Sequence, residues 1–504
     1  MAVTAVLVAV LAVPALGAVV AAVLPDRAGR IAATVTAGIA FLASVALYLV
    51  PGERNAVPFD PPVPAIRPWH EVNVAWVPGL DLRFHLGVDG ISYPLVVLTT
   101  LLTLLCCLYT LWTVPEAGRG RLLVALLLVI EVGILGTFLA LDLVLFFVFF
   151  EVVLLPMYAV IAVWGGDGRR HAARKFVLYT LFGSVLLLVG VFTVVSAAGS
   201  SDLVTLTSSG GAGLSRTTQL AAFVLLAVAF AVKSPLWPLH TWLPDAHTEA
   251  PTVGSVILAG VLLKMGTYGL IRVAIGVAPD GARRVAPVLG VLAVAAIVVG
   301  SLVCLAQNEL KRLIAYSSVG HMGFVLLGIA TLTQTGIQAA LIGNIAHGVI
   351  TGLLFFLAGA IKDRAHTGVL GELGGLRETA PTLAGILGFA AIASLGLPGL
   401  AGFWGEAFAV IAALRLDTPL WTVLAVVAAA GGALTAAYFL RLLRRVTHGP
   451  ASTAVAGITM PRLAVAELVS WAPLVLLALA IGLLPALVLG MAAEPVAAVL
   501  GAGG

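Results

Sequence analysis

Residues 220–241 read LAAFVLLAVAFAVKSPLWPLHT, an apolar run that ends in a lysine and two prolines. About 20 apolar residues in an α-helix cross the hydrocarbon core of a membrane, so this run is long enough to span it. Lys233 would then lie inside the bilayer, where a charge costs about 2.5–3.5 kcal/mol on insertion scales. Pro235 and Pro238 would interrupt the helix, and membranes tolerate such breaks where the backbone lines a polar cavity or is buried in protein. The stretch therefore predicts a broken transmembrane helix with a charge at the break.

Similar apolar runs recur along the whole chain. Of its 504 residues, 61% are hydrophobic and only 10% are charged, whereas a soluble domain has roughly 25% charged residues. We therefore predict an all-α integral membrane protein with about 14 transmembrane helices. The longest interruption, residues 51–87, is rich in proline and is interpreted as an external loop. The first run has no basic residue before it, which predicts a retained helix and not a cleaved signal.

The loop charges predict an orientation. With the N-terminus outside, most of the 27 lysines and arginines fall in loops on the inner side, as the positive-inside rule requires. In this count, Arg272 is assigned to an outer helix end. We expect a multi-pass protein of a bacterial plasma membrane with both termini outside. The net charge of +4 lies in these loops and gives no reason to expect a nucleic-acid partner.

A set of ionisable residues falls within the predicted spans. Besides Lys233, it contains Lys264, Glu131, Glu151, His321, His347 and Glu406. Acids, bases and groups that titrate near neutrality are together what a proton relay needs. The alternative for the lysines is that they snorkel to an interface or pair statically. For Glu131 and His347, a structural role as a buried polar residue remains open, and Asp142, at a helix end, is expected to be a cap or a surface charge.

A second interruption lies further along the chain. The sequence Gly-Leu-Pro-Gly over 396–399 precedes Glu406 much as the first break follows Lys233. Transporters place broken helices at matching positions of two repeats, so we predict two inverted five-helix repeats, each with one broken helix. The predicted repeats cover 121–285 and 286–446. They are flanked by N-terminal helices and the external loop over 1–120 and by a C-terminal helix over 447–504.

The sequence offers no redox chemistry of its own. It contains no glycine-rich dinucleotide loop, no Walker loop and no spaced ligand set for haem or an iron–sulfur cluster. The three cysteines fall in apolar runs and are expected to be small core residues. His240 and His247 lack a His-Glu-x-x-His pattern, so no metal site is predicted. The energy for proton movement must therefore come from a redox-active partner or from an ion gradient.

Two long motifs carry a resemblance to a known family. Residues 233–251, KSPLWPLHTWLPDAHTEAP, and 309–323, ELKRLIAYSSVGHMG, are similar to signatures of the antiporter-like membrane subunits of respiratory NADH:quinone oxidoreductase, complex I. The sequences around Glu151 and Glu406 also resemble the corresponding segments of these subunits. Among the sister subunits, the chain most resembles the M type, the homologue of mitochondrial subunit four. The resemblance extends over about residues 80–447.

The resemblance implies roles for individual residues. Glu151 would pair with Lys233, and Lys264 would pass protons along a hydrated axis through His321 and His347. Glu406 would be the outlet, and no role carries over firmly to Glu131. The resemblance further implies that NADH-to-quinone electron transfer in partner subunits drives the pump. FMN, iron–sulfur clusters and quinone are expected in those partners, which include sister antiporter-like subunits, and lipid would surround the complex.

Two other functions remain open at this point. A subunit of a multisubunit Na⁺/H⁺ antiporter would share the fold and the buried lysines. A scaffold that transports nothing and only anchors its neighbours is a third interpretation, but the row of buried charges argues against it.

Overall fold

The computed structural model of the chain describes residues 2–50, 66–80, 82–456 and 465–501. In these ranges, 12 helices are long and apolar enough to cross a membrane, and a further pair bent by 63° makes a thirteenth span if taken as one. Two shorter apolar helices, Pro381–Ser394 and Ala401–Leu414, lie where the sequence predicts another span. The prediction of a helical membrane protein is confirmed, and the number of about 14 spans stays a prediction.

The N-terminal part consists of α1 (Ala2–Val23), α2 (Asp26–Leu49), β1 (His70–Val77), the 3₁₀ turn η1 (Pro78–Leu80), β2 (Leu82–Val88) and α3 (Tyr93–Trp112). The next part contains α4 (Gly120–Leu139), α5 (Leu143–Val152), α6 (Leu154–Trp164), α7 (Arg169–Ala198), α8 (Leu203–Ser208), α9 (Arg216–Lys233) and α10 (Trp242–Glu249). One continuous span follows, made of α11 (Thr252–Ile257), η2 (Leu258–Leu262), α12 (Leu263–Gly269) and η3 (Leu270–Ile275).

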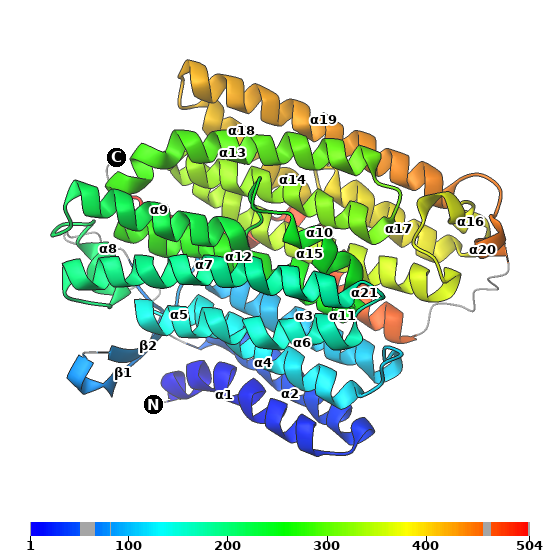
Figure 1. Cartoon of the computed structure of the whole chain (residues 1–504), viewed down its shortest axis with the longest axis horizontal. Helices are drawn as coiled ribbons and strands as arrows, with labels where there is room; N and C mark the ends of the chain where they lie inside the picture. Colours follow the sequence, from blue (N-terminus) through cyan, green and yellow to red (C-terminus); the bar gives the residue numbers. More distant parts are fainter. Residues whose placement is uncertain (1, 51–65, 81, 457–464, 502–504) are drawn as a thin grey trace.

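The remaining helices are α13 (Pro279–Ala306), α14 (Leu310–Ala330), α15 (Gln334–Ala365), η4 (Leu370–Glu372), α16 (Leu376–Thr379), α17 (Pro381–Ser394), α18 (Gly402–Leu414), α19 (Pro419–Thr447), α20 (Thr453–Ala456), α21 (Val465–Leu483) and α22 (Ala486–Val499). The long helices run nearly parallel, with α1 and α2 at one edge of the bundle and α19 at the other (Figure 1).

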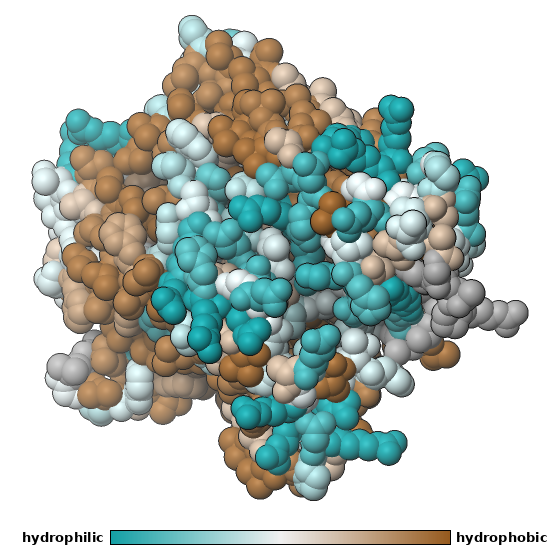
Figure 2. All heavy atoms as spheres, turned by 45° about the vertical axis from the view of Figure 1, so that its right-hand side comes forward, coloured by the Kyte–Doolittle hydropathy of each residue, from teal (hydrophilic) through white to brown (hydrophobic). Residues whose placement is uncertain are grey.

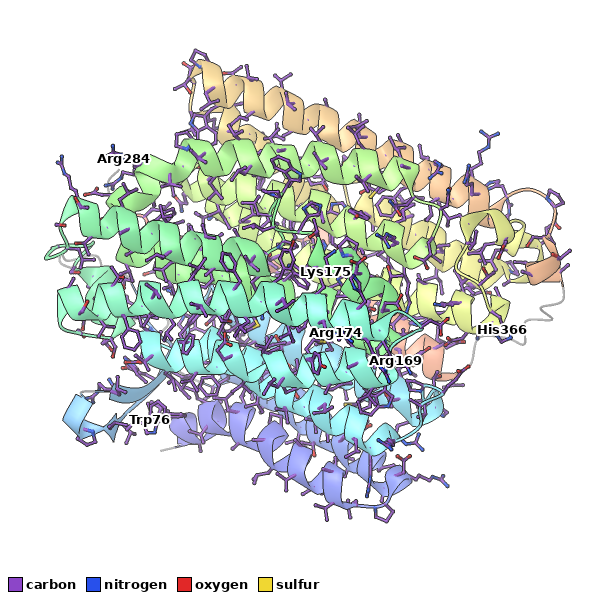
Figure 3. All side chains as sticks on the ribbon, in the orientation of Figure 1. Trp76, Arg169, Arg174, Lys175, Arg284 and His366 are labelled. Atoms are coloured by element: carbon purple, nitrogen blue, oxygen red, sulfur yellow. The ribbon has the colours of Figure 1, made fainter. Side chains whose placement is uncertain are left out.

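The surface of the bundle is apolar along its sides and polar at its ends. On α7, Leu178 and Phe192 are more than half exposed, as expected for side chains that face lipid. Arg169 and His366 lie toward one end of the bundle, whereas Trp76 and Arg284 lie toward the other (Figure 3). Figure 2 turns the first of these ends forward and shows hydrophilic side chains gathered across it, with hydrophobic side chains around them.

The predicted external loop contains a β-hairpin. Residues 51–65 lie outside the described residues, but β1 and β2 pair as an antiparallel two-stranded sheet in which His70 faces Val88. The hairpin packs against the bundle through a bridge between Leu86 and Ala140. The sequence interpretation missed this element because the proline content of the segment concealed the alternation of apolar and polar residues after His70.

Asp142 is a helix cap, as predicted, but it is not a surface charge. Its carboxylate accepts the backbone N–H groups of Val144 and Leu145, each at 2.9 Å, at the start of α5. The residue is 1% exposed, because the connection after α7 covers it and Ser201 donates a hydrogen bond to it. Of the two alternatives, the cap is therefore confirmed and the surface charge is not.

Both predicted interruptions are present in the structure. The chain leaves α9 at Lys233 and enters α10 at Trp242, and it leaves α17 at Ser394 and enters α18 at Gly402. The second break requires glycine, because Gly396 and Gly399 have φ angles of +72° and +90°, which side-chain-bearing residues rarely adopt. The first break begins in buried residues, Ser234 to Leu236, whereas Leu397 and Pro398 of the second break are exposed. The division into inverted repeats stays a prediction.

The span Thr252–Ile275 lies at the centre of the molecule. Its apolar window is completely buried, and the π-helical segments η2 and η3 lie on either side of α12, which carries Lys264. Such π segments are rare and occur frequently at functional sites. The span packs against α9 and α15, so the central lysine lies between helices that carry other candidate residues.

Candidate functional site

Lys233 is the last residue of α9 and is 3% exposed. Its ammonium group lies 4.7 Å from the centroid of the Phe150 ring, a favourable cation–π distance. Glu151, the next residue of α5, accepts a hydrogen bond from Ser184 of α7. The charges of Glu151 and Lys233 interact, although no direct ion pair joins these two described residues. The structure thus places the acid and the base of the first break near each other but separated.

Lys264 is completely buried on α12. Its Nζ donates a hydrogen bond to the carbonyl oxygen of Ala259 in η2 and lies 2.7 Å from Nδ1 of His347 on α15. One turn further along, Thr267 donates to Asn344, also on α15, at 3.0 Å. The two helices are therefore joined by polar contacts in an otherwise apolar interior.

His321 connects α14 with both halves of the second broken helix. Its Nδ1 lies 2.8 Å from a carboxylate oxygen of Glu406 on α18, and its Nε2 lies 2.9 Å from the hydroxyl of Ser394 at the end of α17. The ring centroids of His321 and His347 are 5.9 Å apart. The break therefore holds the acid and the imidazole in contact.

A small cavity adjoins both histidines. It has a volume of about 20 Å³ and is lined by His321, His347, Ser394 and Glu406 among others. Such a cavity is large enough for about one water molecule, and its polar lining supplies hydrogen-bond partners. Nε2 of His347 has no hydrogen-bond partner among the described residues. One water molecule in this cavity would give it a partner and extend the polar contacts from Lys264 to Glu406.

The two groups of residues meet where α12 packs against the first break. A Cβ atom at Gly266 would lie 2.6 Å from the carbonyl oxygen of Phe230 and 2.8 Å from the backbone nitrogen of Ser234. Only glycine permits this approach, which places α12 directly against the residues around Lys233. No direct hydrogen bond joins Lys233 and Lys264 in the described part of the chain, so a proton passing between them needs an intervening carrier.

Glu131 lies apart from these groups. It is 1% exposed on α4, and neither carboxylate oxygen has a hydrogen-bond partner among the described residues. The thiol of Cys107 on α3 lies near it. The geometry therefore gives Glu131 no link to the lysines and histidines of the site.

Sequence reasoning missed further buried groups, among them His247 and Arg272. His247 on α10 is completely buried, and its ring stacks on Phe355 with centroids 4.6 Å apart. Its side chain had been considered only as a metal ligand. In the described residues, no group of three or more His, Cys, Asp and Glu side chains could hold a metal ion.

Arg272 corrects the charge count. It was assigned to an outer helix end, but it is 1% exposed within η3 and forms an ion pair with Asp89, which precedes α3. Its Nε and one terminal nitrogen have no partner among the described residues. The apolar residues on both sides of Arg272 in Leu270–Ile275 were the available signal that it is buried.

The fold and the row of buried charges define an antiporter-like membrane subunit. The chain belongs to the family described as NADH:quinone oxidoreductase/Mrp antiporter, transmembrane, whose model matches residues 140–431. A curated relative, NADH-quinone oxidoreductase subunit M of Rhodobacter capsulatus, is 41% identical over 499 residues, which cover 97% of this chain and 93% of the relative. The predicted resemblance is confirmed.

Solved structures show the same architecture. A chain of respiratory complex I from Thermus thermophilus with bound NADH superimposes with a TM-score of 0.85 at 32% identity, covering 98% of this chain and 100% of that one. A chain of the Mrp complex from Dietzia sp. DQ12-45-1b gives a TM-score of 0.84 at 25% identity, covering 99% of this chain and 100% of that one.

Proposed function

We propose that this chain is a proton-translocating membrane subunit of an NADH:quinone oxidoreductase. The observation that carries the proposal is the contact between Lys264 and His347, which continues through the small cavity to His321 and Glu406. A row of bases and acids that titrate within the bilayer and lie within reach of one water molecule serves proton transfer. The family and its subunit M relatives support the assignment to the oxidoreductase.

The first step is the loading and release of Lys233. Two unit charges about 4 Å apart attract each other by roughly 4 kcal/mol at an effective dielectric constant near 20. When Glu151 approaches Lys233, this attraction stabilises the protonated lysine. When Glu151 turns to Ser184, as in this structure, the attraction weakens and the lysine releases its proton toward Lys264.

The second step moves the proton along α15 and α14. Lys264 gives its proton to Nδ1 of His347, and His347 gives up the proton on Nε2 to the water of the cavity. This water passes a proton to the hydroxyl of Ser394, which gives its own proton to Nε2 of His321, and His321 then holds the proton beside Glu406, the proposed outlet. Each transfer then crosses a single hydrogen bond, and no charge has to move alone through apolar protein.

The partner subunits supply the driving energy in this proposal. FMN, iron–sulfur clusters and quinone belong to them, and sister antiporter-like subunits are neighbours in the membrane. We further propose that both termini lie outside a bacterial plasma membrane and that the chain divides at about residues 120, 285 and 446, as the sequence predicts.

The experiment that tests the function is NADH-driven proton pumping in membranes that carry Lys233→Ala, with assembly of the complex measured in parallel. An assembled complex that no longer pumps would support an obligatory role for Lys233. The matched control is Lys362→Ala, because Lys362 is exposed at the end of α15. Unchanged pumping in the Lys233 variant would overturn the relay and favour a scaffold.

The similarity to a chain of an Mrp complex supports one alternative, a subunit of a Na⁺/H⁺ antiporter. In that case an imposed Na⁺ gradient would drive proton movement through the chain and its partners without NADH. Proton pumping that starts on addition of NADH in sodium-free medium, and stops with an inhibitor of quinone reduction, would exclude it.

A further inference from the structure

A groove with a volume of about 580 Å³ lies between α1, α4 and α6. Its walls are formed by small and branched apolar side chains, including Val19, Val129 and Val163. Val19 is 64% exposed and Val163 is 39% exposed, so the groove opens to the outside of the bundle. In a membrane protein this opening faces lipid or a neighbouring protein.

One end of the groove differs from the rest. Arg119 and Trp164 line it there, and all the other lining residues are apolar. The indole of Trp164 donates a hydrogen bond to the carbonyl oxygen of Gly118 at 2.7 Å, which fixes the ring at the level of the turn before α4. Tryptophan and arginine at the end of a span mark the boundary between hydrocarbon and headgroups. Arg119 is exposed, and no ion pair in the described ranges includes it.

The depth of the groove matches one leaflet. On α4 the apolar lining residues run from Leu122 to Val132, a rise of about 15 Å at 1.5 Å per residue. Half of a hydrocarbon core of about 30 Å has the same depth. A transmembrane helix of a neighbouring subunit would follow the bundle through both leaflets, whereas an acyl chain that starts at the headgroup level ends near the bilayer centre.

We propose that this groove binds a phospholipid with an anionic headgroup. An acyl chain packs against α1, α4 and α6, and the phosphate and its neighbouring negative charge pair with the guanidinium of Arg119. Charge complementarity selects the headgroup, because Arg119 is the charged residue that lines the groove. The end of the bundle with Arg119 is the one that the charge bias assigns to the cytoplasm, where anionic lipids attract basic residues.

Photo-crosslinking in the purified parent complex tests the site. The complex is reconstituted in nanodiscs that contain trace phosphatidylglycerol or phosphatidylcholine with a diazirine on the acyl chain, and labelled peptides are identified by mass spectrometry. We expect peptides of α1, α4 and α6 to react about fivefold more with phosphatidylglycerol, since one basic residue near the surface contributes about that factor. Arg119→Gln should remove the preference, and Ala159→Trp, which fills the groove, should reduce labelling by both lipids.

The controls lie outside the groove. Arg170→Gln removes an exposed arginine at the start of α7, and Val189→Trp adds the same bulk to an exposed position of that helix. Both should leave the labelling unchanged. Equal labelling by the two lipids in the unmodified complex, or labelling that survives both groove variants, would overturn the proposal. So would crosslinking of a photoreactive residue at Val19 to a partner subunit, since a protein would then occupy the groove.

Discussion

Nζ of Lys264 lies 2.7 Å from Nδ1 of His347, and the two side chains are 0% and 5% exposed. When Lys264 is protonated it can only donate, so Nδ1 must accept, and the neutral imidazole then carries its hydrogen on Nε2. That atom has no partner among the described residues, and His347 lines the cavity shared with His321. The single contact thus sets the direction of the ring, with the acceptor toward the lysine and the donor toward the cavity.

We expect His347→Gln to lower the rate of NADH-driven proton pumping by roughly tenfold or more, because side chains that transfer protons in enzymes contribute at least this factor to the rate. Glutamine fills similar space but cannot take up and release a proton. The measurement is the initial pumping rate in membranes with a normally assembled complex. His171→Gln, at an exposed position of α7, is the control, and pumping at the normal rate in His347→Gln would mean that protons bypass the imidazole.

Glu151→Gln separates the charge of Glu151 from its hydrogen bond. The amide oxygen can still accept from Ser184, but the attraction to Lys233 is lost, so we expect a loss of pumping on the order of tenfold. Ser184→Ala should lower pumping as well but by less, because the carboxylate keeps the charge that loads Lys233 and loses only the hydrogen bond that draws it away during release. If Glu151→Gln pumps normally, the coupling of the two charges has no role in loading.

Because Asp89 and Arg272 form an ion pair, we expect the effects of substituting them on stability not to add up. Removal of one partner from a buried pair costs about 3–5 kcal/mol, because the other charge stays buried without compensation. Asp89→Asn keeps the oxygen that caps Ile91 and Ser92, so its effect reports on the charge. We expect each of Asp89→Asn and Arg272→Met to lower the thermal unfolding midpoint of the complex, and the double variant to recover most of the loss.

Additive losses in that double variant would contradict the pairing. A matched single control is Arg283→Met, since the ion pair of Arg283 with Asp280 is exposed. Exposed pairs contribute little, typically about 0–1 kcal/mol, so this control should leave the unfolding midpoint nearly unchanged.

The hairpin should respond to pH through His85. Its Nδ1 lies 2.6 Å from Asp202, before α8, and its Nε2 lies 2.7 Å from Glu71 of β1. Burial alone would lower the pKa of His85, but the hydrogen bonds and charges of Asp202 and Glu71 outweigh it and raise the pKa above 6.5. Protonated His85 therefore stabilises the hairpin fully at a pH below 6.5, the unfolded-state pKa. This stabilisation of the hairpin is lost as the pH rises through the folded-state pKa of His85.

A spin label at Trp76→Cys measures this response. Trp76 is 47% exposed on the hairpin, and the three native cysteines are buried, so labelling should be selective. We expect the label to become more mobile as the pH rises through the folded-state pKa of His85. In His85→Gln the label should be mobile at every pH. A label at Arg284→Cys, toward the same end of the bundle (Figure 3), is the control, and an equal pH response there would refute the assignment to His85.

Much of the candidate site could be predicted because charge is rare in an apolar chain. Lys233 and Lys264 stand out within long runs of apolar residues, and the sequence alone indicates that they are buried. Their partners could not be derived in the same way. The contact of Lys264 with His347 depends on how α12 packs against α15, and the turn of Glu151 toward Ser184 depends on the position of α7. The roles of these residues stay predictions.

The missed elements have a common physical cause. Arg272 was assigned to a helix end because periodicity does not fix where a span stops, and its partner Asp89 is distant in the sequence. The hairpin was missed because the proline content of residues 51–87 indicated a loop and concealed the alternation of apolar and polar residues in the two strands. Charge counting therefore gives an orientation only when the buried arginines have been removed from the count.

The complete burial of the span Thr252–Ile275 has a consequence for biogenesis. This span carries two charged side chains, Lys264 and Arg272, and each would cost about 2.5–3.5 kcal/mol in a helix exposed to lipid. We therefore expect it not to enter the lipid phase as a single helix. Its packing partners α3, α9 and α15 must surround these charges and keep them away from lipid. Since α15 is synthesised after it, the central span should stay at the machinery until the second half of the chain has entered the membrane.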